Sequence, residues 1–217
     1  MQNFTKKFSD THFRLKTFLT LTLIFNVAYS IFLFTVGSTN GSKWLIVSSI
    51  YYLLLFVIRL YILIKIENPT SRKQEILTMQ LSGEYLLLIN LAIATLMQYI
   101  IYSDNQVYYH EIVVITIATF TFLSLTLAVI GYVKFLNKND YLYVSVKLIS
   151  LTSASVSLVT LTNTMLLTFG NGNSLLRSII LPLLCIAVSL FIIFLAITII
   201  KKSNLALKEL KNEEKSK

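Results

Sequence analysis

The segment Lys147–Met165, KLISLTSASVSLVTLTNTM, is long enough to cross a membrane yet is rich in Ser and Thr. A membrane-spanning helix needs about 20 residues, and its lipid-facing side chains are normally apolar. Polar side chains in such a helix usually face protein or water. We therefore predict that this segment is an interior helix and that the remaining spans surround it.

The hydroxyl side chains of this segment fall on one face of a helix when residues are projected at about 100° each. They are Ser150, Ser153, Ser157, Thr160 and Thr164. The opposite side, which we expect to face lipid, carries Leu148, Leu151, Leu158, Val159, Met165 and Leu166. The hydroxyl face has two interpretations. It is a dry seam packed against other helices, or it is the wall of a polar cavity.

The composition of the whole chain is typical of an integral membrane protein. Of its 217 residues, 55% are hydrophobic and 13% are charged, whereas soluble domains carry about 25% charged residues. The segments without Lys, Arg, Asp or Glu are 17–42, 85–103, 112–133, 148–176 and 178–200. A further span, 44–64, contains only Arg59, whose long stem we expect to reach toward the membrane boundary marked by Lys65. The sequence thus predicts an all-α bundle of six transmembrane helices.

Basic residues gather before the first span, in alternate loops and after the last span. By the positive-inside rule, this distribution predicts that both termini are cytoplasmic in a multi-pass protein of the plasma membrane. The net charge of +9 is then a signal of topology, and no basic patch with interleaved aromatic residues indicates nucleic-acid binding. We predict three regions: a cytoplasmic interfacial segment (1–16), the transmembrane domain (17–201) and a charged cytoplasmic tail (202–217).

Other polar residues at membrane depth extend the predicted polar interior. They are Asn26, Asn90, Gln98 and Asn163. A charged cluster is expected near the inner ends of three helices, formed by Arg59, Glu84 and Lys147, with Glu84 neutralising one of the two cations. Such a cluster has two interpretations: a site for a substrate or coupling ion, and a structural clamp at the headgroup boundary.

The chain lacks motifs of the common enzyme classes. It has no phosphate-binding glycine loop, no HExxH, no GxSxG and no His or Cys cluster. The single cysteine, Cys185, has no histidine at membrane depth to activate it. We therefore predict no enzymatic activity, no cofactor, and no catalytic or metal-binding residues.

Three segments resemble a family of small six-span membrane proteins from Gram-positive bacteria, a family without an assigned function. They are IYYLLLFVIR (50–59), FTFLSLTLAVIGYVK (120–134) and KLISLTSASVSLVTLTNTMLLTFG (147–170). Members of that family carry a lysine near position 124 and a glutamine near position 162, where this chain has Ser124 and Thr162. The resemblance implies the six-span topology alone.

Two functional hypotheses follow from the sequence. In the first, the protein is a small transporter or permease-like bundle with a polar interior on the span around Ser157. In the second, it is an accessory or immunity-type subunit that does not transport. It would bind another membrane protein, or a second copy of itself, within the lipid bilayer.

Overall fold

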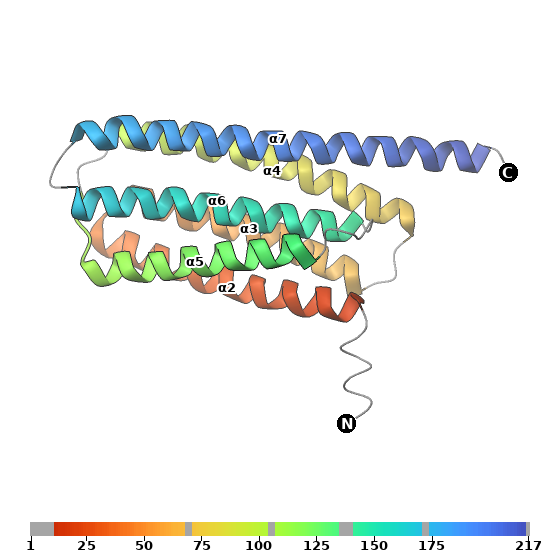
Figure 1. Ribbon diagram of the computed structural model, residues 1–217, viewed down its shortest axis with the longest axis horizontal. Coiled ribbons are helices and arrows are strands. Elements are labelled where there is room, and N and C mark those ends of the chain that lie inside the picture. Colours follow the sequence, from red (N-terminus) through yellow and green to blue (C-terminus); the bar gives the residue numbers. More distant parts are fainter. Residues whose placement is uncertain (1–10, 68–70, 104–106, 135–140, 171–173, 216–217) are drawn as a thin grey trace, which may run out of the picture.

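The computed structural model describes residues 11–67, 71–103, 107–134, 141–170 and 174–215. These residues form six helices and no strand, so the predicted all-α class is confirmed (Figure 1). The helices are α2 (Thr11–Asn40), α3 (Lys43–Glu67), α4 (Arg72–Ser103), α5 (Glu111–Lys134), α6 (Tyr141–Phe169) and α7 (Ser174–Lys215).

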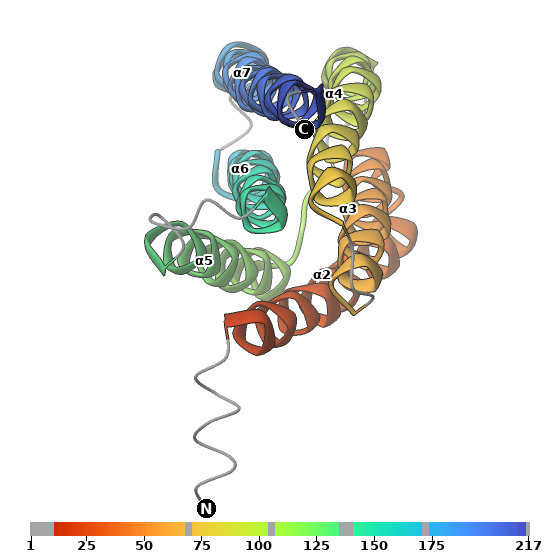
Figure 2. The same cartoon turned by 90° about the vertical axis from the view of Figure 1, so that its right-hand side faces the viewer.

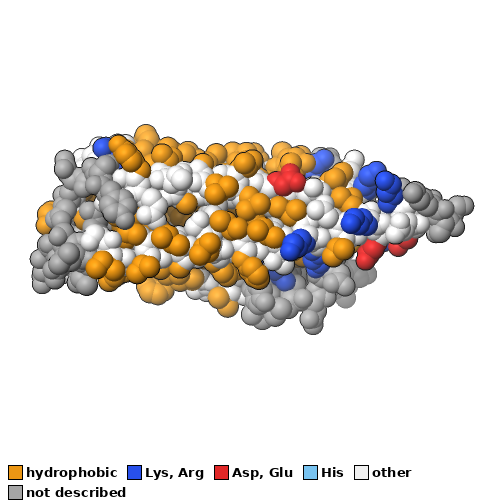
Figure 3. All heavy atoms as spheres, turned by 90° about the horizontal axis from the view of Figure 1, so that it is seen from above, with side chains coloured by type: hydrophobic (Ala, Val, Ile, Leu, Met, Phe, Trp, Pro, Cys, Tyr) orange, Lys and Arg blue, Asp and Glu red, His pale blue; other side chains and the backbone are white. Residues whose placement is uncertain are grey.

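Each helix contains an apolar stretch that is long enough to cross a membrane, which confirms the six predicted spans. These stretches are 21 to 36 residues long, against the roughly 20 that a hydrocarbon core of about 30 Å requires. Apolar side chains cover the middle of the surface, and Lys and Arg gather at one end (Figure 3). We call this end, which carries Lys65, Lys201 and Lys202, the basic end.

The helices pack as three neighbouring antiparallel pairs: α2 with α3, α4 with α7, and α5 with α6. Viewed along the bundle, the other five helices form an arc around α6 (Figure 2). α6 contacts α3, α4, α5 and α7, and 67% of its spanning segment is buried, the largest share of any helix. The predicted interior helix is therefore present.

One expectation for α6 is wrong in part, because its apolar side does not face lipid throughout. Leu148 and Val159 are only 7% and 6% exposed, whereas Leu158 and Met165 are 38% and 46% exposed. Helices on several sides of α6 cover most of its circumference, so only a narrow strip of that side remains for lipid.

The two longest helices, α4 and α7, reach beyond the others at the basic end (Figure 1). α4 begins directly after Ser71, whose carbonyl accepts the backbone N–H of Gln74 at 2.8 Å. The helix then runs without a break into the uncharged segment 85–103. α7 likewise continues past Lys201, so the predicted boundary between membrane domain and tail falls inside one helix.

α4 and α7 approach closely at Gly83. A Cβ atom added to Gly83 would lie 2.9 Å from Cγ1 of Ile200 and 3.3 Å from the carbonyl oxygen of Ala196. Further toward the basic end, the Ser203 hydroxyl donates to the carbonyl of Ile76 at 3.0 Å. The pair is therefore joined by close backbone packing and by a buried hydrogen bond.

Candidate functional site

The hydroxyl face of α6 is buried and packed over the part from Ser157 to Thr164. The hydroxyls of Ser157, Thr160 and Thr164 all donate to carbonyls of their own helix, at 2.8 to 3.1 Å. A hydroxyl that bonds its own helix in this way needs no water. All three side chains are fully buried.

Neighbouring helices contact this face directly. Thr121 on α5 donates to the carbonyl of Ile117 in its own helix at 2.8 Å and also reaches the carbonyl of Ser157 at 3.3 Å. One turn before this part of the face, Tyr52 on α3 donates to the carbonyl of Ser153 at 3.2 Å. The hydroxyls of Ser48 and Thr160 lie 3.4 Å apart. This part of the face thus fits the packing-seam interpretation, in which small residues let helices approach.

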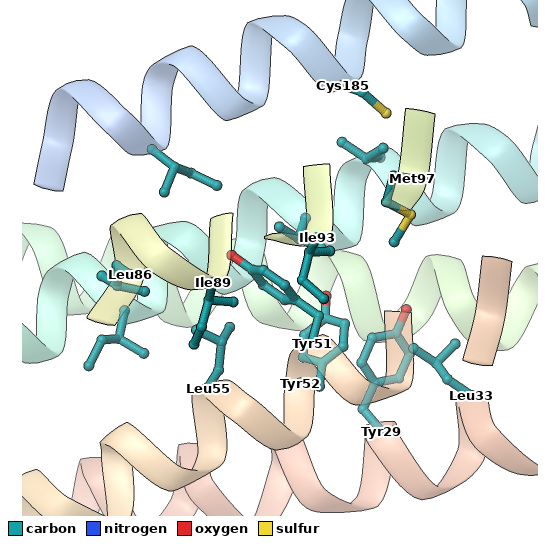
Figure 4. Close-up of a cluster of buried hydrophobic side chains, with 14 of the residues drawn as sticks. Tyr29, Leu33, Tyr51, Tyr52, Leu55, Leu86, Ile89, Ile93, Met97 and Cys185 are labelled. Atoms are coloured by element: carbon teal, nitrogen blue, oxygen red, sulfur yellow. The ribbon is translucent and has the colours of Figure 1, made fainter. Parts of the chain in front are cut away.

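A cavity between α3, α4, α6 and α7 borders the seam at Thr160. Measured as the space open to the centre of a water molecule, it is about 40 Å³. Its walls are mainly apolar and include Ile93, Met97 and Cys185 (Figure 4). Cavities with apolar walls stay dry, and Asn90 at its edge already donates to Ser189 Oγ at 2.8 Å. This cavity therefore has few polar groups with which to bind a ligand.

The other end of the hydroxyl face borders a smaller, polar cavity. Four helices line it, and we call it the Arg59 cavity; its walls are Thr22, Phe25, Asn26, Arg59, Ser124, Leu127, Ser150 and Ser153. The space open to the centre of a water molecule is about 10 Å³, about what one water molecule needs.

From the sequence, Arg59 was expected to extend toward Lys65 at the membrane boundary. That expectation is wrong, because the side chain is buried. Only 3% of the residue is exposed, and its Nη1 donates to the carbonyl of Thr22 on α2 at 3.1 Å. Arg59 lies six positions before Lys65, which places it about 9 Å from Lys65 along the helix axis. Arg59 turns inward because it shares the buried face of α3 with Tyr52, two turns earlier.

Two further polar groups of the Arg59 cavity are buried without a hydrogen-bond partner among the described residues. They are Nδ2 of Asn26 and Oγ of Ser150. Arg59 itself has five N–H groups, and the described residues accept from one of them. The cavity therefore combines a buried cation with unused hydrogen-bonding capacity.

The described residues bring no carboxylate within ion-pair distance of Arg59. Glu84, the expected partner, is exposed on α4 and accepts a hydrogen bond from Gln80 at 2.9 Å. It borders a surface groove with Lys65 and makes no ion pair with Arg59 or Lys147. The expected neutralisation of Arg59 or Lys147 by Glu84 is therefore wrong, because Arg59 points to the interior and Glu84 lies exposed on α4.

The third member of the expected cluster, Lys147, lies half-buried on α6. It borders neither the Arg59 cavity nor the groove at Glu84. The structure therefore places the three charged residues in three different surroundings. Of the three, only Arg59 belongs to a polar cavity.

The remaining polar residues predicted for the interior divide between several places. Asn26 lines the Arg59 cavity, whereas Asn90 and Gln98 hold α4 to α7, the latter by a 3.5 Å contact to the carbonyl of Pro182. Asn163 is fully buried on α6, and its amide has no partner among the described residues. It does not line the Arg59 cavity.

Aromatic rings pack beside the Arg59 cavity on the side away from the basic end. Phe120 of α5 stacks on Tyr29 of α2 with ring centroids 4.7 Å apart, and its centroid is 5.0 Å from that of Phe25. Tyr29 also meets the edge of Tyr52 at 4.8 Å, and both rings lie in the buried cluster of Figure 4. These rings fill the space between α2, α3 and α5.

Sequence reasoning missed the inward direction of Arg59, although the sequence contains a signal for it. Tyr52, Leu55, Arg59 and Ile62 are spaced by three or four residues and so share one face of α3. All four are buried. An arginine in register with a tyrosine and two large apolar residues was therefore positioned for the interior.

Two comparisons with known proteins found no match. No protein-family model matches the chain, and no curated protein is significantly similar to it. The resemblance to a six-span family of Gram-positive bacteria therefore stays a prediction. What is shown is an integral membrane bundle of six apolar helices, with a buried arginine at a polar cavity.

Proposed function

We propose that the protein is a small transporter-like or permease-like protein of the plasma membrane, with its solute site at the Arg59 cavity. The observation that carries this proposal is a buried guanidinium that faces unpartnered polar groups. Ionisable side chains inside a membrane bundle commonly mark the pathway of a solute or an ion. The site lies at one end of the α6 hydroxyl face instead of along all of it.

The proposal includes an orientation. By the positive-inside rule, the basic end faces the cytoplasm, so both termini are cytoplasmic. The Arg59 cavity then lies in the cytoplasmic half of the bundle, and the stacked rings of Tyr29 and Phe120 lie on its outward side. Transport would require those rings to separate.

One observation favours a second function, that of an accessory subunit that binds another membrane protein or a second copy of itself. The hydroxyl face from Ser157 to Thr164 is a packed seam, which is what a purely structural bundle requires. In this alternative the Arg59 cavity stays closed. Opening of the cavity therefore separates the two functions.

Thiol labelling in a Cys185→Ala background tests whether the cavity opens. A cysteine replaces Ser150, and a membrane-impermeant thiol reagent is applied to intact cells and to inverted vesicles. If the bundle transports, the cavity must open to water, and Ser150→Cys is expected to react in inverted vesicles. Ser157→Cys is the matched control, because it lies on the same face of α6 in the dry seam.

Two exposed positions calibrate the assay: Lys202→Cys at the basic end and Ser38→Cys at the opposite end. With a cytoplasmic basic end, Lys202→Cys reacts in inverted vesicles and Ser38→Cys in intact cells. If both calibrating positions react and Ser150→Cys reacts from neither side, the transport proposal fails and the accessory function is preferred.

A further inference from the structure

We propose that the Arg59 cavity binds one anionic group, a halide or a single oxygen of an oxyanion. This names the ligand class of the proposed function and rests on that function only for the claim that the bound group is carried across the membrane. The inference comes from three properties of the cavity: its donors, its charge and its size.

The polar groups turned to the Arg59 cavity are mainly hydrogen-bond donors. Arg59 has N–H groups beyond the one given to Thr22, and a guanidinium has no acceptor. The Asn26 group without a partner is its Nδ2, also a donor, and the free Ser150 hydroxyl can donate. All three residues are more than nine-tenths buried. Their complement is a ligand that accepts several hydrogen bonds.

The charge of the cavity points to an anion. A guanidinium stays protonated in proteins, and removing it from water is costly unless an opposite charge or good hydrogen bonds replace the water. Among the described residues, one carbonyl accepts from Arg59 and no carboxylate is within ion-pair distance. An anion would supply both the charge and the acceptors, whereas a metal ion or an ammonium group would be repelled.

The size of the cavity limits the ligand to one small group at a time. The space open to the centre of a water molecule is about 10 Å³. A halide, or one oxygen of a phosphate or carboxylate, is a group of about that size. A larger anion would have to leave most of its atoms outside.

The position of the cavity leaves two sources for such an anion. Half-buried Phe25 and Leu127 line its wall on α2 and α5, two helices that contact each other only slightly. A dissolved anion and the phosphate of an anionic lipid headgroup share the required chemistry. The experiment must therefore distinguish them.

Thermal unfolding of the full-length protein, followed by the fluorescence of buried Trp44, is the test. In micelles of a nonionic detergent, chloride or phosphate is titrated into a low-salt buffer, and saturation distinguishes binding from a general effect of ionic strength. We expect a saturable rise of Tm with chloride or phosphate. In a second arm, vesicles of phosphatidylcholine are compared with vesicles that contain phosphatidylglycerol. A rise confined to phosphatidylglycerol identifies a lipid headgroup as the ligand.

Variants test whether the rise of Tm with anions comes from binding in the Arg59 cavity. Arg59→Gln is expected to abolish the saturable rise, and Arg72→Gln, which removes an exposed cation, is expected to keep it. Ser150→Ala changes little volume and should fold. Loss of its hydroxyl is expected to raise the half-saturating anion concentration roughly tenfold, as loss of a hydrogen bond to a charged group does. This variant keeps the proposal testable if Arg59→Gln does not fold.

Three results would overturn the proposal. They are a Tm that does not depend on any of these anions, a dependence that Arg59→Gln retains, and a half-saturating concentration unchanged in Ser150→Ala. The first means that the cavity holds water only, and the others mean binding elsewhere on the protein. Anion binding with no labelling of Ser150→Cys would uphold the ligand class and reject transport.

Discussion

The hydroxyl face of α6 carries similar side chains at both ends, in opposite surroundings. From Ser157 to Thr164 the hydroxyls bond their own helix, and α3 and α5 pack directly against them. Near Ser150 the same face borders a polar cavity with a buried cation, and the Ser150 hydroxyl has no described partner. Residue type alone therefore does not decide between a seam and a site. The side chains on the opposing helices decide it.

The largest expected difference in stability comes from placing an aspartate at each of the two ends of the α6 hydroxyl face. Ser157→Asp buries a charge in the packed seam and is expected to destabilise the bundle by about 3 kcal/mol or more. Ser150→Asp places a carboxylate in the cavity of Arg59, where the opposite charge offsets most of that cost. We expect the two variants to differ by at least about 2 kcal/mol. Reversible unfolding in detergent by dodecyl sulfate measures the difference, and equal destabilisation would refute the contrast between the ends.

A smaller effect is expected when the volume of the side chain is increased. Ser157→Val adds carbon atoms to a packed seam and is expected to cost about 1–3 kcal/mol. The cavity leaves room for the added carbon atoms in Ser150→Val, so a loss below about 1 kcal/mol is expected. The same unfolding assay applies. A larger loss for Ser150→Val than for Ser157→Val would mean that the cavity is already filled by tightly held groups.

The smallest effect concerns a single hydrogen bond across the seam. Thr121→Val keeps the shape of the side chain and removes the hydroxyl shared by the carbonyls of Ile117 and Ser157, so its loss is expected to exceed that of a purely intrahelical hydroxyl by about 0.6 kcal/mol. Thr126→Val is the matched control, because Thr126 is exposed on the same helix and bonds only the carbonyl of Phe122, within its own helix. Equal losses in the two variants would show that the contact to Ser157 contributes nothing.

The fold was predictable because charged residues are few in this chain and lie mainly between long uncharged segments. Segments free of charged residues defined five of the six helices, and the Ser and Thr of Lys147–Met165 marked α6 as the interior helix. Which neighbours α6 would have was not predictable. Leu148 and Val159 were expected to face lipid because the sequence analysis divided the helix into one polar and one apolar face. In the structure, α6 has neighbouring helices on several sides, and they cover these two residues.

The site was predictable only in its components. Asn26, Arg59, Ser150 and Ser153 were all expected to matter, but the sequence does not state which of them share a cavity. Arg59 was expected to reach for water because its stem is long enough, yet the face of α3 on which it lies turns it inward. Glu84 was assigned to one of the two cations, Arg59 or Lys147, by depth alone, and depth does not fix the direction in which a helix presents a side chain.

The close contact of α4 and α7 at Gly83 has a mechanical consequence. Because the two helices are also joined at Ser203, they are expected to tilt as one rigid rod. The part of α7 beyond Lys201 extends about 20 Å at 1.5 Å per residue, so a tilt of about 10° would move its end by about 4 Å. Small rearrangements among the membrane helices would thus be amplified at the C-terminal end, where a distance-sensitive spectroscopic label would detect them.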